Sequence, residues 1–176
     1  MIREATASDI DGIAFVHATS WKTTYRGLIS DEFLDKITVE ARRKLWIRNF
    51  ETPNKDEVMY VAEDEAGTGT IIGFANGGAR RGPDLSDLYD AELYALYLLK
   101  EQQGKGLGRQ LIRSVAQNLL EKNYSSFMTW VVTGNPAIHF YHKVGGQSVA
   151  TKEVKIGNEI VEEIMIGWRD IGVVGG

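Results

Sequence analysis

The residues with the clearest chemical use are three alternate glycines, Gly104, Gly106 and Gly108, which stand between an apolar segment and a helical pattern. A helix that begins at such a turn presents unpaired backbone NH groups and its positive dipole end, and glycines let a ligand approach the main chain. Lys105 and Arg109 add positive charge. The turn therefore suits a ligand with more than one phosphate. A strand-to-helix turn with a solvated lysine fits the same letters equally well.

Two other phosphate-binding motifs do not fit this turn. A dinucleotide fingerprint that starts at Gly104 needs a glycine where Arg109 stands. A P-loop needs Ser or Thr directly after its Gly-Lys pair, and this chain has Gly106 there.

The turn does match the pattern Q/R-x-x-G-x-G/A, with Gln103, Gly106 and Gly108 at its fixed positions. Together with the preceding strand, the following helix and the later stretch "GNPAIHFYHKVGG" (134–146), this pattern resembles the GCN5-related N-acetyltransferases. The resemblance extends along most of the chain. It implies acetyl-CoA as the acetyl donor and an α/β (α+β) fold whose mixed, largely antiparallel sheet has splayed parallel central strands.

In this family the main chain does most of the cofactor binding. The strand before the glycine turn pairs with the pantetheine arm, and one of its NH groups, that of Leu96 or Leu98, stabilises negative charge on the thioester oxygen. The NH groups of the turn hold the pyrophosphate. The resemblance implies these cofactor-binding residues: Leu96, Tyr97, Leu98, Gln103, Gly104, Lys105, Gly106, Leu107, Gly108, Arg109 and Asn135.

Tyr141, in "FYHKVGG", stands where similar enzymes place a tyrosine near the thioester sulfur. A phenol with a pKa near 10 is protonated at neutral pH and can give a proton to the departing thiolate. A tyrosine that only packs in the core is the alternative. The spacing from Asn135 to Tyr141 is one residue shorter than is usual in the family, which makes the contact of the asparagine less secure.

Glu92, at the start of the strand, occupies a position that some relatives use as the base for the incoming ammonium group. Strand alternation predicts that it shares a face with Tyr94, Leu96 and Leu98. A chain of waters could serve instead. A solvent-facing carboxylate at a strand end is equally compatible with the sequence.

The segment "SWKTTYRGL" lies where similar proteins cover the acceptor pocket. Trp21 and Tyr25 would form an aromatic wall, and Arg26 would meet a carboxylate. Aromatic anchors that merely close a loop are the alternative. The three histidines offer no third ligand for a metal, so we expect no metal site.

These residues must be positioned by a particular order of elements. After a short strand at 2–5 and two or three helices, three strands follow at 57–64, 70–80 and 91–99. Leucines and a valine at i+4 spacing predict a helix from the glycine turn to about residue 122. A strand at 125–132, a short helix and a hairpin over 148–168 complete the order. It predicts a mixed sheet with helices on both faces.

Length and composition limit the function further. The 176 residues suit one domain over 1–176, with a loose tail from about 170. A net charge of −4 disfavours nucleic acid as a partner, and the absence of cysteine excludes disulfides. No apolar run approaches the roughly 18 residues of a membrane span, and no signal peptide is evident, so we expect a cytoplasmic protein. Four basic residues predict a solvated helix face: Arg42, Arg43, Lys44 and Arg48.

The sequence as a whole predicts an enzyme that moves acetyl from acetyl-CoA directly to a primary amine of a small molecule. Two alternatives remain open: acetylation of a peptide N-terminus or lysine, and a CoA-binding sensor without turnover. The C-terminal hairpin also offers an edge for a homodimer.

Overall fold

The computed structural model describes residues 1–82 and 88–175. In this part of the chain seven strands form one sheet in the order β1-β2-β3-β4-β5-β7-β6. The strands are β1 (Ile2–Glu4), β2 (Val58–Glu63), β3 (Ile71–Ala79), β4 (Ala91–Leu98), β5 (Phe127–Val132), β6 (Gln147–Ile156) and β7 (Glu159–Trp168). The α-helices are α1 (Ile10–Tyr25), α2 (Asp31–Asp35), α3 (Val39–Glu51), α4 (Leu107–Glu121) and α5 (Ala137–Lys143). The 3-10 helices are η1 (Ala7–Asp9), η2 (Lys100–Gln102) and η3 (Ile171–Gly175).

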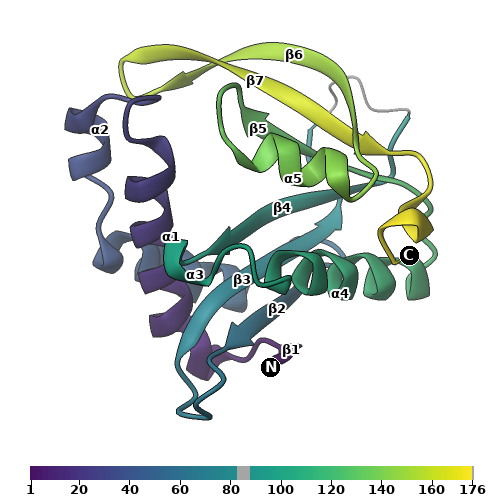
Figure 1. Cartoon of the computed structure of the whole chain (residues 1–176), viewed down its shortest axis with the longest axis horizontal. Coiled ribbons are helices and arrows are strands. Elements are labelled where there is room, and N and C mark those ends of the chain that lie inside the picture. The colour runs from purple at the N-terminus through teal and green to yellow at the C-terminus, as the bar shows by residue number, and fades with distance from the viewer. Residues whose placement is uncertain (83–87, 176) are drawn as a thin grey trace.

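The centre of the sheet holds its one parallel contact, between β4 and β5. All other neighbouring strands pair antiparallel. β4 and β5 pair only at their first residues, Ala91 with Phe127 and Glu92 with Met128, and then diverge, as Figure 1 shows. The predicted mixed, largely antiparallel sheet with splayed parallel central strands is therefore confirmed.

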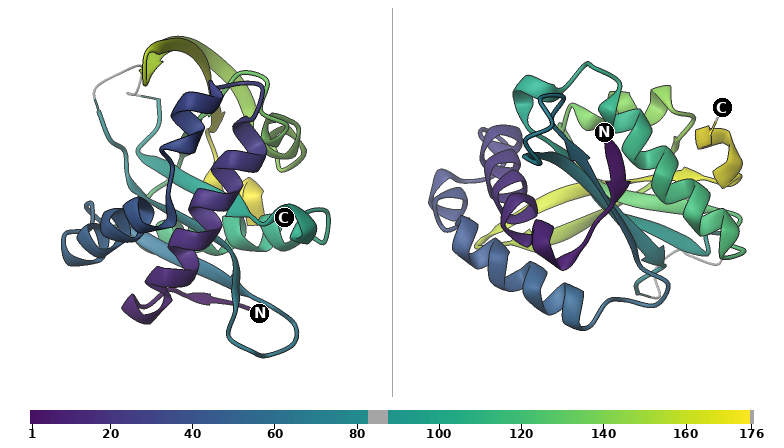
Figure 2. Two further views of the ribbon diagram at one scale, coloured as in Figure 1. Left: turned by 90° about the vertical axis from the view of Figure 1, so that its left-hand side faces the viewer. Right: turned by 90° about the horizontal axis from the view of Figure 1, so that it is seen from below.

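Helices cover both faces of the sheet, as predicted (Figure 2). On one face α4 places Leu111, Val115 and Leu119 in a core where none of the three is exposed to solvent. Their i+4 spacing is the pattern that predicted this helix. On the other face α1 and α3 pack with Ile13 and Phe74 in a second core.

A buried polar contact joins α1 and α3. The helix α3 begins at Thr38, whose Oγ1 accepts a hydrogen bond from the NH of Ala41 at 3.1 Å. Further along this helix, Trp46 is buried, and its indole NH donates to Nδ1 of His17 on α1 at 3.1 Å. On the face of the sheet opposite α4, the two helices are thus held together by packing and by a buried hydrogen bond.

The prediction of a loose tail from about residue 170 is wrong for residues Ile171–Gly175, which form η3. Ile171 and Val174 lie on one face of η3, and both are buried against the core that α4 covers. The NH of Ile171 also donates to the carbonyl of Ser125 at 2.8 Å. Apolar side chains three residues apart eclipse in a 3-10 turn, which gives this short segment a face to bury.

Two general features concern residues 1–82 and 88–175. None of their helices has both the length and the apolar character needed to cross a membrane. In the same residues no group of three or more His, Asp or Glu side chains lies close enough to hold a metal ion.

Candidate active site

The gap between β4 and β5 exposes the main chain of β4. At its origin Thr129 Oγ1 donates to the carbonyl of Leu93 at 3.0 Å. Further along, the NH of Leu99 donates to the carbonyl of Ile72 on β3 at 3.0 Å. Because residues of an antiparallel strand point their backbone groups to alternate sides, those of Leu98 point into the gap. Leu96 is two residues earlier in unbroken register with β3, so its backbone groups also point into the gap.

The glycine turn closes one end of this gap. Gly104 and Gly106 have φ angles of 78° and 81°, in the left-handed region where glycine is favoured. Gly106 is the N-cap of α4, and no side chain caps the helix. The first NH groups of α4, from Leu107 to Arg109, have no partner within the helix itself. The turn therefore offers a row of backbone donors at a helix N-terminus, which suits a phosphate.

Side chains around the turn support its main chain. Gln103 Nε2 and Ser20 Oγ both donate to the carbonyl of Leu98 at 3.3 Å. Lys105 Nζ donates to Gln102 Oε1 at 2.9 Å and is exposed to solvent. Arg109 is also exposed. The two cations therefore lie at the rim of the turn, where they can approach a ligand without displacing the core.

Gly108 has room for a Cβ but not for a much larger side chain. A Cβ at this position would lie 3.4 Å from the ring of Phe140 and 3.5 Å from a methyl of Leu98. The first turn of α4 therefore packs directly against α5 and the end of β4. A bulky side chain at residue 108 would have to push these elements apart.

Tyr141 of α5 is buried at the same gap. Its ring stands edge-on to Trp168 with centroids 5.8 Å apart. Burial, with a smaller effect of Tyr97, raises the pKa of the Tyr141 phenol above its usual range. The phenol is therefore protonated at neutral pH, which is the state that donates a hydrogen bond.

Asn135 links the start of α5 to Tyr25, one of the residues predicted to cover the acceptor pocket. Its Oδ1 accepts from the NH of Ala137 at 2.9 Å, and its Nδ2 donates to the hydroxyl of Tyr25 at 3.5 Å. The amide thus has partners within the protein. Its predicted contact with a pantetheine arm requires the Tyr25 hydrogen bond to be shared or exchanged.

The predicted aromatic wall is present on the face of the sheet that α1 covers. Trp21 and Tyr25 lie with ring centroids 4.5 Å apart. Tyr97 of β4 points to this face and stacks on His17 at 5.1 Å. Burial raises the pKa of the Tyr25 and Tyr141 phenols, and the neighbouring Tyr97 adds a smaller increase to both. The wall therefore continues into the gap where Tyr141 lies.

Arg26, the third predicted acceptor residue, points away from this wall. It is exposed and forms an ion pair with Asp31 at 3.3 Å. It lines a shallow surface pocket beside Leu28, Ser30 and Glu159. The structure thus brings Trp21 and Tyr25 together but leaves Arg26 at the periphery.

Glu92 does not share a face with Leu96 and Leu98, so the predicted alternation is wrong. The register of β4 with β3 shifts between Leu93 and Ala95, which places Tyr94 in a bulge. Glu92 consequently lies on the same face as Ala95 and Tyr97, while Leu96 and Leu98 pack in the α4 core. A one-residue bulge inverts the facing of every residue beyond it.

Arg81 binds the carboxylate of Glu92 on both oxygens. Its Nη2 lies 2.9 Å from Oε1 and its Nε lies 3.3 Å from Oε2, and its backbone NH donates to Oε2 at 3.0 Å. The side chain of Glu92 is only 7% exposed. Glu92 therefore lies on the face of the sheet that α1 and α3 cover, which we call the acceptor face. Its carboxylate is already paired with Arg81.

The structure adds two charged residues that the sequence did not single out for the site. Glu163 of β7 pairs with Val132 of the neighbouring strand β5. Burial raises the pKa of its carboxyl group against the lowering effect of the charge of Lys152, and the charge of Glu92 adds a smaller increase. Arg42 of α3 places its guanidinium 5.2 Å from the ring centre of Trp21. Neither residue belongs to a motif, because each reaches the face from an element far away in the sequence.

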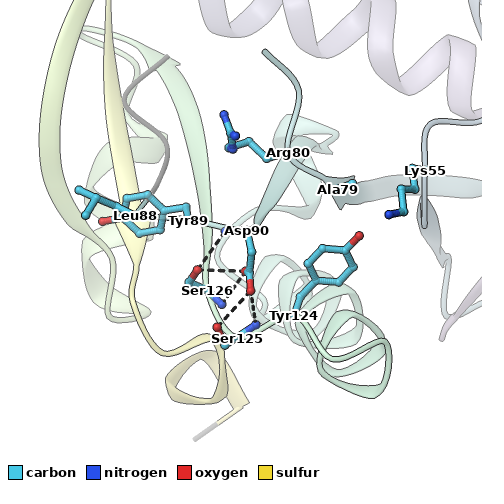
Figure 3. A pocket seen from close by; sticks show the side chains of 9 residues that line it. All are labelled: Lys55, Ala79, Arg80, Leu88, Tyr89, Asp90, Tyr124, Ser125 and Ser126. Atoms are coloured by element: carbon cyan, nitrogen blue, oxygen red, sulfur yellow. Dashed lines mark hydrogen bonds between the residues drawn. The ribbon is translucent and has the colours of Figure 1, made fainter. Parts of the chain in front are cut away.

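A separate pocket of about 530 Å³ lies at the opposite end of β4, where β4 begins (Figure 3). Asp90 there accepts hydrogen bonds from the backbone NH and the hydroxyl groups of both Ser125 and Ser126, at 2.9 to 3.1 Å. These bonds lower the pKa of Asp90 against the opposing effect of burial. They join the starts of β4 and β5, so we assign Asp90 to holding the parallel pair together.

Comparisons with known proteins agree with this geometry. The model of the family described as FR47-like protein matches residues 84–155. The chain is 35% identical over 173 residues to YuaI, an uncharacterized N-acetyltransferase of Bacillus subtilis, and the match covers 98% of this chain and 95% of that protein. It is 25% identical over 146 residues to the spermidine N(1)-acetyltransferase of Thermoplasma acidophilum, and that match covers 82% of this chain and 86% of that protein.

Solved structures show the same fold. The PaiA N-acetyltransferase of Thermoplasma acidophilum, solved in complex with coenzyme A, superposes with a TM-score of 0.66 at 24% identity. The match covers 93% of this chain and 96% of that one. The similarity therefore extends over nearly the whole of both chains.

Proposed function

This chain belongs to the GCN5-related N-acetyltransferase family, and we propose that it transfers an acetyl group from acetyl-CoA directly to a primary amine of a small molecule. The observation that carries the proposal is the continuous main-chain surface from β4 to the start of α4. Its Leu96 and Leu98 backbone groups face a gap, and its glycine turn ends in an uncapped helix N-terminus. These features fit a thioester arm followed by a pyrophosphate.

Acetyl-CoA supplies an activated acyl group whose carbonyl carbon an amine can attack. On the protein side, the NH of Leu96 or Leu98 would donate to the thioester oxygen as negative charge develops on it. The NH groups from Gly104 to Arg109 would hold the pyrophosphate, with Lys105 and Arg109 as counter-charges at the rim. Fixed backbone donors need no rearrangement during the reaction, which makes such stabilisation effective.

Tyr141 is the proton donor in this proposal. The hydroxyl must be protonated to assist the departing thiolate, and its burial keeps it so across the ordinary pH range. Asn135, whose amide donates a hydrogen bond to the hydroxyl of Tyr25, would contact the pantetheine arm.

The base that takes the proton of the ammonium group is Glu163, Glu92 or a chain of waters. We favour Glu163, because a carboxyl group with a raised pKa accepts a proton more readily. Glu92 has both oxygens engaged by Arg81, which leaves it less free to accept a proton directly. In this proposal Glu92 shapes the acceptor face and supports the raised pKa of Glu163.

Small amines are favoured over peptides by two features. The related spermidine N(1)-acetyltransferase is named for a small polyamine. On this chain the aromatic side chains of Trp21, Tyr25 and Tyr97 lie next to one another on the acceptor face. Aromatic walls with a few polar groups are typical of small-molecule sites.

A thiol-release assay tests the proposal. The protein is incubated with acetyl-CoA and, separately, with alkylamines, polyamines, amino acids and short peptides with free N-termini or lysines. We expect CoA release with small amines and little with peptides. Release only with peptides would replace the small-molecule acceptor by a peptide. Thermal stabilisation by acetyl-CoA without release in any mixture would indicate a sensor instead.

A further inference from the structure

Three buried side-chain atoms lack a hydrogen-bond partner in the described part of the chain: Trp21 Nε1, Arg42 Nε and Asn76 Oδ1. All three residues lie on the acceptor face of the sheet. Trp21 and Arg42 come from α1 and α3, which cover that face, and Asn76 shares it with Phe74 of β3. Buried polar groups are nearly always paired with protein, ordered water or a ligand, so these three atoms mark positions where a water molecule or a polar ligand group would bind.

Arg42 differs from the basic residues beside it on α3. Arg43 pairs with Asp11 at 2.7 Å and Lys44 pairs with Glu40 at 3.6 Å, both at the exposed surface. Arg42 is half-buried, and within residues 1–82 and 88–175 no carboxylate pairs with it. Burial lowers the pKa of its guanidinium, which nevertheless stays charged at neutral pH. The prediction that all these basic residues form a solvated face is therefore wrong for Arg42.

The neighbours of Arg42 leave its charge uncompensated. Its guanidinium stands over the ring of Trp21, and the indole NH of Trp21 neighbours the hydroxyl of Tyr97 without meeting the geometry of a regular hydrogen bond. The nearest imidazole, that of His17, is kept neutral: burial, and to a lesser extent the charge of Arg42, lowers its pKa to about 3. A guanidinium that has no carboxylate partner among the described residues and has a free Nε donor, beside an indole NH, suits an anionic group.

The opposite chemistry lies further along the same face. Asn76 Nδ2 donates to Glu57 Oε1 at 2.6 Å, which orients the amide and leaves Oδ1 as an unpaired acceptor. Glu163 lies on this face as well, with the positive charge of Lys152 near it, and Glu92 lies there paired with Arg81. One part of the acceptor face thus carries a positive charge without a carboxylate partner in the described part of the chain, and another offers the Asn76 oxygen and the Glu163 carboxylate to an ammonium group.

We propose that Arg42 and Trp21 bind an acidic group, a carboxylate or a phosphoryl group, on the same molecule whose amine is acetylated. The proposal rests on the proposed function and narrows it to amines that also carry a negative charge. The guanidinium and the indole NH would donate to the acidic group. The amine would lie toward Glu163 and the gap between β4 and β5.

The test compares matched acceptors. ω-Amino carboxylates of increasing chain length, the corresponding aminoalkyl phosphates and plain alkylamines of equal length are assayed for CoA release, together with leucine against 3-methylbutylamine. We expect at least one acidic amine to exceed its plain counterpart in kcat/KM by about 10- to 100-fold, the range for charge-assisted hydrogen bonds. The carboxylate and phosphate arms identify which acidic group is bound.

Variants locate the effect. Arg42→Gln should remove most of the preference by raising KM for the acidic amine by a similar factor more than it changes KM for the plain amine, and Arg42→Lys should restore part of the preference. Arg43→Gln, one residue away and paired with Asp11, should keep it. Equal rates for acidic and plain amines in the wild type, or an unchanged preference in Arg42→Gln, would overturn the proposal.

A binding measurement separates this proposal from the proposed function. The melting temperature of the CoA-saturated protein is measured with each acidic amine. A rise in the wild type that is lost in Arg42→Gln supports the anion site even when no amine is acetylated, and in that case the proposed function alone fails. No rise with any acidic amine, or an equal rise in Arg42→Gln, overturns the anion site.

Discussion

The two sides of β4 are built in different ways. The cofactor side is a contiguous piece of main chain, from Leu96 through the glycine turn to Arg109. The acceptor side is a set of side chains from α1, α3, β3, β4 and β7 that meet only in the folded protein. The cofactor side therefore depends on backbone conformation at a few positions. The acceptor side depends on the identity of side chains that are distant in sequence.

The largest effect is expected from a change of backbone at the glycine turn. Gly106→Val should abolish measurable binding of acetyl-CoA in calorimetry, because φ of 81° and the row of NH donors would be lost. Gly69→Val is the matched control: its φ is 75° and, as at Gly106, no atom lies within 4 Å of the place that a Cβ would occupy. Each variant should lose about 1–3 kcal/mol of stability from strain. Equal cofactor binding in both variants would contradict the account of the cofactor side.

Removal of the Tyr141 hydroxyl should have the next largest effect. Tyr141→Phe should lower kcat by about 100- to 10,000-fold, the range for a lost general acid, with little change in KM for acetyl-CoA. Tyr124→Phe is the control, because that hydroxyl bonds Asp56 at 2.6 Å, away from the gap. An unchanged kcat in Tyr141→Phe would assign the residue to packing.

The acceptor side is tested by its two glutamates. Glu163→Gln should lower kcat/KM by about 100-fold near neutral pH and remove the acidic limb of its pH profile. Because the pKa of Glu163 is raised, that limb should lie above the ordinary range of a glutamate. Glu92→Gln should retain the limb. A profile altered by Glu92→Gln and not by Glu163→Gln would make Glu92 the base.

The smallest expected effect concerns stability on the acceptor side. His17 has its pKa lowered to about 3 in the folded protein, against about 6.5 when unfolded. The unfolded state therefore binds more protons as the pH falls below 6.5, and stability is lost progressively down to about pH 3. Between pH 7.5 and pH 5 the loss should be about 2 kcal/mol in urea unfolding. His17→Gln should lack this slope, and the exposed His142→Gln should keep it.

Most of the cofactor side could be predicted from the sequence. A left-handed backbone at a helix N-terminus requires glycine, so Gly104 and Gly106 record their conformation in their residue type. The leucines of α4 likewise record a helical period. The family resemblance then identified acetyl-CoA as the ligand for this turn and the preceding strand, which residue types had already predicted.

The acceptor side could be predicted only in part. Trp21 and Tyr25 were found through their position in the chain. The bulge at Tyr94 places Glu92 on the face opposite Leu96 and Leu98, and the residue types around it do not predict a bulge. Arg42 looks like any helix-surface arginine until the packing of α3 against α1 buries it beside Trp21. Such contacts are set by tertiary packing and not by local pattern.

Direct attack of the amine on bound acetyl-CoA is tested by an initial-rate series in which the concentrations of acetyl-CoA and an accepted amine are both varied. The intact mass of the enzyme is also recorded after incubation with acetyl-CoA alone. Direct attack on a cofactor held by the main chain of β4 predicts intersecting double-reciprocal lines and an unmodified enzyme. Parallel lines together with an acetylated enzyme would show that the acetyl group passes through a protein side chain, and would contradict the account.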